Sequence, residues 1–234
     1  GIEDRKVMLS TDFQPKVEQI LSSVDKNTKV LFLCSPNNPT GNSFSTEKVE
    51  TLLQRFPGLV LIDEAYIDFS KQESWANQLR IYPNLVITQT LSKAYGMAGI
   101  RLGICYASEE IIQILNKIKS PYNVNELTQQ KAVERLQDRE RVAQEIASIL
   151  SERNHLSIAL EEISFIEKIY ASDANFILIK VDDATKRYNQ LIANGIVIRN
   201  RTNQPLCENT LRLTVGIKEE NEKLMKGLKD LQGY

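Results

Sequence analysis

The sequence contains a single histidine, His155, and only three cysteines. A Ser-His-Asp triad and most zinc sites need a histidine, so either would have to use His155. At about 100° per residue, His155 falls on the helix face opposite the expected apolar stripe. That stripe runs along Val142, Ile146, Ile149, Leu156 and Leu160. We therefore predict that His155 is exposed, and that the protein has no metal site.

Closely spaced cysteines and long apolar runs are also missing. Cys34, Cys105 and Cys207 lie too far apart in the sequence for a CxxC metal site or a local redox pair. An odd number of such cysteines is typical of a reducing compartment. The longest apolar runs, Val30–Cys34 and Leu59–Ile62, are far shorter than the ~18 residues of a membrane span. With no signal-peptide pattern at the start, we expect a cytoplasmic protein with no membrane partner.

Charge of one sign is not in excess. Lys and Arg number 29 against 30 Asp and Glu, for a formal net charge of −1. Such a balance has nothing to attract nucleic acid. Hydrophobic residues make up 42% of the 234 residues and charged residues 25%, which excludes collagen-like, disordered and disulfide-scaffold proteins. At about 150 residues per domain, the length fits one large domain or two modest ones.

An initial methionine is absent as well. Residue 1 is glycine, and the apolar triplet Val7–Leu9 follows almost at once. This triplet predicts a strand that has nothing before it to pair with. We expect the sequence to be a fragment that lacks its N-terminal part.

What is present predicts an α/β fold. Three apolar runs, Val30–Cys34, Leu59–Ile62 and Asn84–Thr88, are typical of strands buried on both faces of a parallel sheet. Helical spacing follows the first run, over 45–56, and ends at Pro57-Gly58. Ser108 is placed to cap a further helix, and a long helical region is expected from about residue 126 to 163.

Shorter units follow from about residue 164. We predict strands over 165–170, 175–181, 196–199 and 211–215, and helices over 184–193 and 219–231. Gly195 stands where a helix C-cap is expected. Mixed short strands and helices indicate a small α+β domain. We place a large domain at residues 1–150 and the small one at 151–234.

Polar side chains follow the three apolar strands. Asn38 comes after the first, Asp63 and Tyr66 after the second, and Lys93, with Thr90 and Ser92, after the third. Taken singly, each has an ordinary explanation: a turn cap, a core phenol or a solvated amine. Ligands of open α/β sheets bind at the carboxyl ends of the strands, where these residues would meet.

One cofactor needs this whole set. Pyridoxal phosphate requires an amine for a Schiff base, a carboxylate for its ring nitrogen, and hydroxyl and Arg donors for its phosphate. The stretch 90–103 supplies Lys93, hydroxyl groups and Arg101 together. Its glycines do not have the spacing of a dinucleotide fingerprint.

The same stretches resemble the fold-type-I pyridoxal-phosphate aminotransferases, and within them the histidinol-phosphate aminotransferases. The similar segments are SPNNPTG at 35–41, DEAY at 63–66, SK at 92–93 with Arg101, KSPYNVN at 119–125, ANF at 174–176 and LRLTVG at 211–216. The resemblance implies a large domain with a mainly parallel sheet and flanking helices, plus a small α+β C-terminal domain. It also implies transfer of an amino group between glutamate and imidazole acetol phosphate or histidinol phosphate, a step of histidine biosynthesis.

The resemblance assigns roles at the cofactor ring. Lys93 would bind the cofactor covalently and then move a proton on the substrate. Asp63 would pair with the ring nitrogen, while Asn38 and Tyr66 would donate to the 3′ oxygen. We expect Lys93, Asp63 and Tyr66 to be the catalytic residues. A cis peptide bond between Asn38 and Pro39 would orient the asparagine.

The resemblance also assigns the binding of anions. Ser92 and Arg101 would bind the cofactor phosphate, with Thr90 a weaker candidate. The planar fork of arginine suits phosphate because it donates two hydrogen bonds at once. Arg212 would bind the carboxylate of the amino donor, and Arg199 the phosphate of the other substrate. A surface ion pair is the alternative explanation for each.

The family is longer at its N-terminus and forms homodimers. The missing part carries a glycine-containing loop for the cofactor phosphate, a stacking aromatic ring and a tyrosine that reaches across the dimer. We therefore expect this chain alone to bind the cofactor weakly or not at all, and the whole protein to be a homodimer that acts on small molecules.

Three alternatives remain open at this point. One is a catalytically inactive interaction module, which only the expected lack of the N-terminal part supports. Another enzyme of the same fold type, such as a threonine-phosphate decarboxylase or an aromatic aminotransferase, would use the same Lys93, Asp63 and Arg101. A nucleoside triphosphatase is a remote alternative, because Leu59–Glu64 resembles a Walker-B strand. The GxxxxGK[ST] motif that should accompany such a strand is absent.

Overall fold

The structure, a computed structural model, describes residues 2–232. Its contacts divide the chain into two compact units. The first comprises the residues up to Pro36 together with Ser43–Val142, and the second comprises Asn37–Asn42 and the residues from Ala143 onward. The segment Asn37–Asn42 therefore belongs with residues that lie far from it in the sequence. Our placement of two domains at 1–150 and 151–234 stays a prediction.

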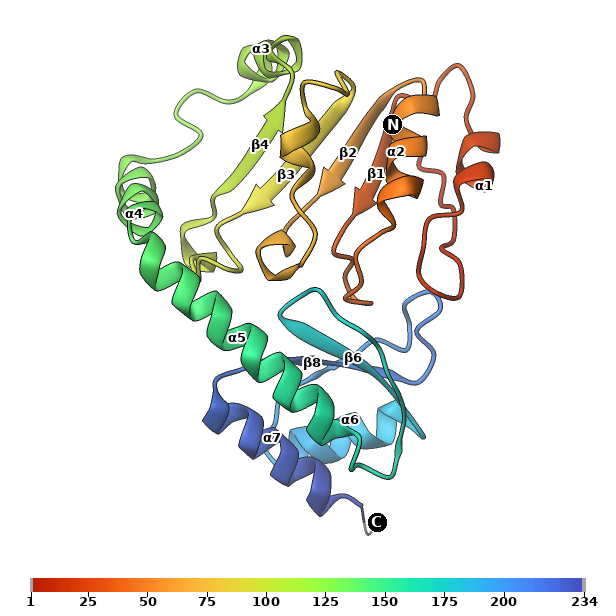
Figure 1. Cartoon of the computed structure of the whole chain (residues 1–234), viewed down its shortest axis with the longest axis vertical. Helices are drawn as coiled ribbons and strands as arrows, with labels where there is room; N and C mark the ends of the chain where they lie inside the picture. Colours follow the sequence, from red (N-terminus) through yellow and green to blue (C-terminus); the bar gives the residue numbers. More distant parts are fainter. Residues whose placement is uncertain (1, 233–234) are drawn as a thin grey trace. The chain divides into compact units, whose positions relative to one another are not determined.

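The first unit is a four-stranded sheet with helices around it (Figure 1). Strands β1, β2 and β3 are parallel neighbours, and β4 runs antiparallel at the edge beside β3. The parallel strands confirm the α/β fold class. In chain order the elements are α1 (Val17–Ser22), β1 (Val30–Cys34), α2 (Thr46–Arg55), β2 (Leu59–Asp63), η1 (Ile67–Phe69), η2 (Trp75–Gln78), β3 (Leu85–Thr90), η3 (Ala98–Ile100), β4 (Gly103–Ala107), α3 (Glu109–Ile118) and α4 (Glu126–Gln137).

One face of this sheet forms the core of the first unit. Helix α2 buries Val49, Leu52 and Leu53, whose spacing puts them on one side of the helix. They belong to one cluster with the alternate residues of the strands, Leu33, Val60, Ile62, Leu85 and Ile87. Because strand side chains alternate between faces, the intervening residues point to the other side.

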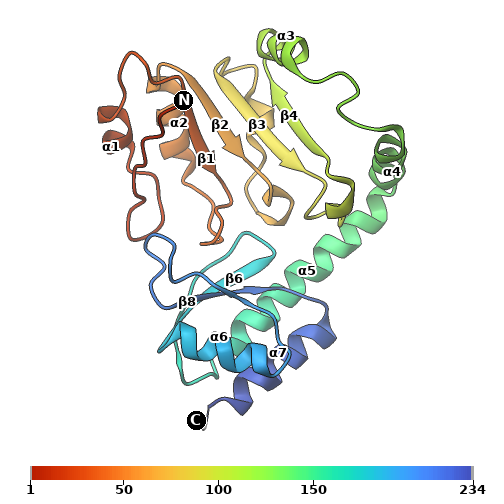
Figure 2. The same cartoon turned by 180° about the vertical axis from the view of Figure 1, so that it is seen from behind.

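That other face is more open. Phe32 in the edge strand β1 is 72% exposed and its neighbour on the same face, Val30, is 39% exposed. Figure 2 shows the strands from this side. Asp63, at the end of β2, lies on the same face as Thr88, its partner in β3.

The second unit is built on an antiparallel sheet of order β5-β6-β8-β7. Helix α5 (Arg139–Leu160) contributes from Ala143 onward. The remaining elements are β5 (Ile166–Ile169), β6 (Phe176–Val181), α6 (Ala184–Ala193), β7 (Arg199–Asn200), β8 (Thr210–Thr214) and α7 (Lys218–Asp230). Gly195 follows α6 with a positive φ of 70°, which confirms the expected C-cap position.

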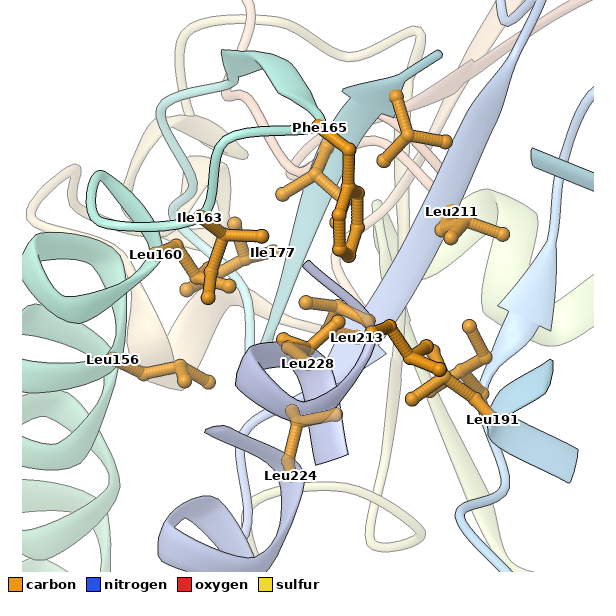
Figure 3. Packing of buried hydrophobic residues seen from close by; sticks show 14 of the residues in the cluster. Leu156, Leu160, Ile163, Phe165, Ile177, Leu191, Leu211, Leu213, Leu224 and Leu228 are labelled. Carbon is orange, nitrogen blue, oxygen red and sulfur yellow. The ribbon is translucent and has the colours of Figure 1, made fainter. Parts of the chain in front are cut away.

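Helices cover one face of this second sheet. Figure 3 shows the apolar side chains of that face, such as Ile177, Leu211 and Leu213, against Leu156 of α5 and Leu228 of α7. All five are nearly inaccessible to solvent. This packing makes the second unit a helix-covered antiparallel sheet. The other sheet face carries Arg199 and Arg212 together with the buried Phe176 and Leu178.

Several expectations about local structure were wrong. Val7–Leu9 forms no strand; Val7 and Leu9 instead pack against the core of the first unit. The long helical region breaks at Asp138, which separates α4 from α5. The strand expected over 196–199 is reduced to β7, because the Ile196 amide donates to the Leu191 carbonyl and completes the end of α6.

Two further observations concern the expectations from composition. The His155 side chain is 72% exposed, as its position on the helix predicted. Within residues 2–232, none of the helices combines the length with the apolar character that a membrane crossing requires.

Candidate active site

The parallel strands of the first unit end at a common edge. Cys34 is the register partner of Asp63, and Asp63 is the partner of Thr88. Backbone hydrogen bonds extend this alignment, because the Glu64 amide donates to the Thr88 carbonyl at 2.8 Å. Thr90, two residues further along β3, lies on the same face as Thr88 and Asp63. The carboxylate and the hydroxyl thus come from neighbouring strands at one edge of the sheet.

Lys93 and Tyr66 meet beyond this edge. Each residue follows its strand by three positions, β3 and β2 respectively. The Lys93 Nζ lies 5.2 Å from the centre of the Tyr66 ring. Tyr66 is 5% exposed, whereas Lys93 is exposed. An ammonium over the face of an aromatic ring is attracted by the ring quadrupole, so the phenol ring favours this position of the amine.

The loop that carries Lys93 is compact. The Met97 amide donates to the Leu91 carbonyl at 2.9 Å, and the Gly96 amide donates to the Lys93 carbonyl at 3.0 Å. Leu91 and Ala94 are buried and anchor the loop to the first unit. The loop therefore presents the lysine side chain to solvent from a fixed backbone.

The hydroxyl groups of this loop differ in their freedom. The Thr90 Oγ1 accepts from the Ser92 amide at 3.0 Å and donates to the Leu102 carbonyl at 3.4 Å. These bonds occupy the Thr90 hydroxyl within the turn. Ser92 is half-exposed, which makes its hydroxyl the better placed of the two for a bound anion.

Arg101 lies across from these residues. It follows η3 in a left-handed conformation with φ of 55°, and its Nη1 donates to the Ala98 carbonyl at 2.9 Å. Two residues later, Gly103 is the register partner of Thr90. Ser92 lies two residues after Thr90, and Arg101 lies two residues before Gly103. Because Thr90 and Gly103 are register partners, the two ends of the loop 91–102 lie close together.

Glu64 is a functional candidate that the sequence did not single out. The side chain is 1% exposed, although its carboxylate follows Asp63 directly. It accepts from the Ser74 hydroxyl at 2.6 Å, the Trp75 amide at 2.7 Å and the Gln89 Nε2 at 2.9 Å. Burial raises the pKa of the Glu64 carboxyl. This network ties the end of β2 to β3, and no spacing in the sequence distinguishes Glu64 from a solvated acid.

The second unit brings together Asn38 and Arg212. The Arg212 Nη1 donates to the Asn38 Oδ1 at 2.7 Å. The peptide bonds before Pro36 and Pro39 are both cis, the latter as expected. Arg212 also lies over the ring of Phe176, with its Cζ 4.9 Å from the ring centre. Its guanidinium is therefore oriented by an amide and an aromatic face.

Arg199 stands beside Arg212 in the same sheet. The two residues are register partners in β7 and β8, and Arg212 is also the partner of Leu178 in β6. Directly opposed residues share one face of an antiparallel sheet. The structure thus places two arginines side by side on the face of the second sheet that the helices leave open.

The candidate residues therefore form two sets. Asp63, Tyr66, Thr90, Ser92, Lys93 and Arg101 belong to the first unit, and Asn38, Arg199 and Arg212 to the second. The first set joins an amine, a carboxylate, a phenol, a hydroxyl and a guanidinium at one sheet edge. Such donors suit a ligand with an electrophilic carbonyl, a basic ring nitrogen and a phosphate.

Comparison with known proteins agrees with this chemistry. The sequence profile of aminotransferase class I and II matches residues 1–228. The chain belongs to this family. Membership of the aminotransferase class I and II family sets aside the triphosphatase alternative. The resemblance of Leu59–Glu64 to a Walker-B strand has another explanation. Glu64 is buried and accepts hydrogen bonds from Ser74 and Gln89, so it has a structural role in this family member.

Similar proteins within the family are histidinol-phosphate aminotransferases. The chain is 68% identical over 229 residues to the enzyme of that name from Flavobacterium johnsoniae. The aligned region spans 98% of this chain and 66% of that relative. It is 58% identical to the enzyme of that name from Christiangramia forsetii, with 99% and 66% covered. The chain thus spans slightly less than two thirds of the length of these relatives.

Solved structures show the same fold. The histidinol-phosphate aminotransferase from Clostridium acetobutylicum superposes with a TM-score of 0.89 at 26% identity, over 96% of this chain and 70% of that one. The enzyme of that name from Sinorhizobium meliloti, solved in complex with pyridoxal-5′-phosphate, gives 0.88 at 23% identity, over 98% of this chain and 64% of that one. These similarities confirm that the chain has the fold-type-I architecture.

Proposed function

We propose that this chain is the greater part of a pyridoxal-phosphate-dependent aminotransferase that moves an amino group between glutamate and imidazole acetol phosphate or histidinol phosphate. The observation that carries the proposal is the Lys93 amine, 5.2 Å from the centre of the Tyr66 ring. It follows the strand beside the one that ends in Asp63. Relatives at 58% to 68% identity with the histidinol-phosphate aminotransferase name support this substrate pair over others.

The first-unit residues fit the cofactor. When bound, pyridoxal phosphate supplies an aldehyde that condenses with amines and a ring that draws electrons away from the substrate Cα. Lys93 would hold it covalently, Asp63 would pair with the protonated ring nitrogen, and Tyr66 would donate to the 3′ oxygen. Its phosphate would be held by Ser92 and Arg101, with Thr90 in a lesser role.

Lys93 is the residue that would move the proton. Its amine, once released by the incoming amino substrate, is the base that can take a proton from the Cα and return it to a neighbouring carbon. Such positioned proton transfer contributes roughly 10²- to 10⁴-fold in rate. The hydrogen bonds that close the Leu91–Met97 loop keep the lysine backbone in place, and the Tyr66 ring attracts the ammonium form.

The second-unit residues would bind the substrates. Arg212 would take the carboxylate of glutamate and Arg199 the phosphate of the other substrate, as the resemblance implies. Their position as neighbours on one sheet face supports a site for substrates that carry anionic groups. The role of Asn38 at the 3′ oxygen stays a prediction. Its hydrogen bond to Arg212 supports a position near the bound substrates.

Product analysis tests this function. The protein at the full length of its relatives is given histidinol phosphate and 2-oxoglutarate with the cofactor. We expect glutamate and imidazole acetol phosphate in equal amounts. The Lys93→Ala variant should form neither product, whereas Lys117→Ala, which removes an exposed lysine of α3, should match the wild type. Carbon dioxide release without glutamate would contradict the proposal and favour a decarboxylase.

We also propose that the whole protein is a homodimer, as the resemblance implies, and that it lies in the cytoplasm, as its cysteine usage indicates. Within residues 2–232, Cys34, Cys105 and Cys207 form no disulfide, which is compatible with a reducing compartment. Sedimentation of the full-length protein should give twice the mass of one chain. A stable monomer that turns over substrate would contradict the homodimer.

A further inference from the structure

The face of the second sheet that the helices do not cover carries a row of arginines. Arg199 in β7 and Arg212 in β8 are register partners. Arg201 follows Arg199 by two residues, and its amide donates to the Thr210 carbonyl at 2.9 Å, so the ladder continues past β7. Residues two apart in an extended segment share a face. Arg201 therefore lies on the same face as Arg199 and Arg212.

Arg201 lacks the partners that a half-buried cation normally has. Its Nε is inaccessible to solvent and has no hydrogen-bond acceptor. Among residues 2–232, no carboxylate lies within ion-pair distance of its guanidinium. The hydroxyl of the next residue, Thr202, is also buried without a partner. Buried polar groups are hydrogen-bonded in nearly all folded proteins, so two adjacent exceptions call for a missing acceptor.

The thiol of Cys207 does not supply the missing charge. The charge of Arg201 favours the ionised form of this thiol. Burial nonetheless raises the pKa of the Cys207 thiol, so the thiol remains neutral at pH 7. Cys207 lies in the connection between β7 and β8 and is completely buried. Neither this thiol nor a carboxylate within residues 2–232 therefore balances the positive charge of Arg201.

Charge balance indicates which anion. A carboxylate carries one negative charge, and the single guanidinium of Arg212 can balance it. A phosphomonoester carries close to two negative charges at pH 7. Arg199 and Arg201, two residues apart on one strand, together balance such a dianion. The guanidinium of an arginine also forms the paired hydrogen bonds that phosphate oxygens accept.

We propose that Arg201 is a third arginine of the anion site on this sheet, and that it binds, with Arg199, the phosphate of the phosphorylated substrate. The inference rests on the proposed function for the identity of that substrate. It assigns to Arg201 the preference for a phosphate dianion over an uncharged group at the same position. Arg212 keeps its separate role toward the carboxylate of glutamate.

The test compares substrates with and without the phosphate, in the protein at the full length of its relatives. Arg201→Met should lower kcat/KM for histidinol phosphate by roughly ten- to hundredfold, the loss typical of a hydrogen bond to a charged group. The same variant should leave kcat/KM for histidinol and for glutamate unchanged. Arg201→Lys, which keeps the charge without the fork, should fall between.

A matched control removes a cation elsewhere in the same unit. Lys226 is exposed on α7, on the helix-covered side of the sheet. Lys226→Met should leave kcat/KM unchanged for histidinol phosphate, histidinol and glutamate. An equal fall for histidinol phosphate and histidinol in Arg201→Met would overturn the proposal, because it would show a structural role. No fall for either substrate would overturn it as well.

A binding experiment separates this proposal from the proposed function. Inorganic phosphate is titrated into the 234-residue chain at constant ionic strength, with chloride as the balancing anion, and the midpoint of thermal unfolding is measured. Phosphate should stabilise Arg201→Met less than the wild type and Lys226→Met, because Ser92 and Arg101 remain available to phosphate in every variant. Equal stabilisation of all three, or of none, would overturn the role of Arg201. Failure of amino transfer in the full-length wild type would instead overturn the proposed function alone.

Discussion

Arg212 and Asn38 are joined by a hydrogen bond of 2.7 Å although 174 residues separate them in the sequence. The short segment Asn37–Asn42, which carries Asn38, makes most of its contacts with the second unit, to which Arg212 belongs. The Asp173 amide fixes the same segment by donating to the Gly41 carbonyl at 2.7 Å. A residue expected at the cofactor and a residue expected at the substrate are thus neighbours within one unit.

A first prediction concerns Arg212. Arg212→Lys keeps the charge but loses the planar fork, so it cannot donate to Asn38 and to a carboxylate with the same geometry. We expect KM for glutamate to rise at least about tenfold in the full-length protein, the scale of one charge-assisted hydrogen bond. KM for histidinol phosphate should change little. Steady-state kinetics with each substrate varied in turn measures both values, and an equal rise in both would contradict the assignment.

A second prediction concerns Asp63. Its Oδ1 accepts one hydrogen bond, from the Ala65 amide at 3.1 Å, so Asp63→Asn keeps the shape and most of the local bonding. We expect unfolding free energy to change by about 1 kcal/mol or less. Amino transfer by the full-length protein should fall by roughly 10² or more, because the ring nitrogen loses its negative partner.

The control for Asp63→Asn is Asp230→Asn, which neutralises an exposed carboxylate at the end of α7. It should leave both the stability and the rate unchanged. Normal amino transfer by Asp63→Asn would count heavily against the proposed role of this carboxylate.

A third prediction concerns the pH dependence contributed by Glu64. Burial raises its pKa in the folded state above the ordinary value of 4.5. The folded state therefore binds the proton more tightly than the unfolded state. The stabilisation from this group is complete below the unfolded pKa and is lost as the pH rises through the folded pKa. Glu64→Gln removes this titration, so its stability should depend less on pH over that range.

Urea unfolding at a series of pH values from 4 to 8 measures the effect, as the difference between wild type and Glu64→Gln. A difference that grows more favourable to the variant as pH rises agrees with the prediction. A difference that does not vary with pH would contradict it. Glu64→Ala should destabilise the chain by about 1–3 kcal/mol at every pH, since Ser74, Trp75 and Gln89 all lose their acceptor.

A fourth prediction compares two neighbours in β1. Phe32 is 72% exposed on the open face of the first sheet, whereas Leu33 is 7% exposed in the core. In the 234-residue chain, Phe32→Ser should change unfolding free energy by less than about 0.5 kcal/mol. Leu33→Ala should cost about 2–5 kcal/mol, because it leaves a cavity. Urea unfolding of both variants measures the contrast, and similar losses would contradict the assignment of the two faces.

Elements with strong periodicity could be predicted from the sequence. The apolar runs of β1, β2 and β3 correctly gave a parallel sheet, and the spacing of Val49, Leu52 and Leu53 gave α2. Strand β4 was not predicted. It is a short edge strand, its residues Ile104–Tyr106 are all at least partly exposed, and it pairs on one side only. Its apolar run, Ile104–Ala107, is only four residues long and directly precedes the helix that starts after Ser108, so the sequence alone does not distinguish it from the beginning of a helix.

Other features depend on contacts that a local pattern does not encode. Val7–Leu9 has the composition of a strand, but it forms none. The side chains of Val7 and Leu9 pack against the core of the first unit instead. The break at Asp138 involves neither proline nor glycine, so the helical periodicity continues through it. The motif that carries Asp63 and Lys93 was visible in the sequence, whereas the pairing of Asn38 with Arg212 depends on the fold.

The central claim is that the Lys93 amine forms the covalent bond with pyridoxal phosphate. The protein at the full length of its relatives is incubated with the cofactor, reduced with borohydride and digested, and the modified peptide is mapped by mass spectrometry. The account predicts the label on Lys93, and its loss in Lys93→Ala with no new labelled lysine. A label on any other residue of the wild type, or no label at all, would contradict it.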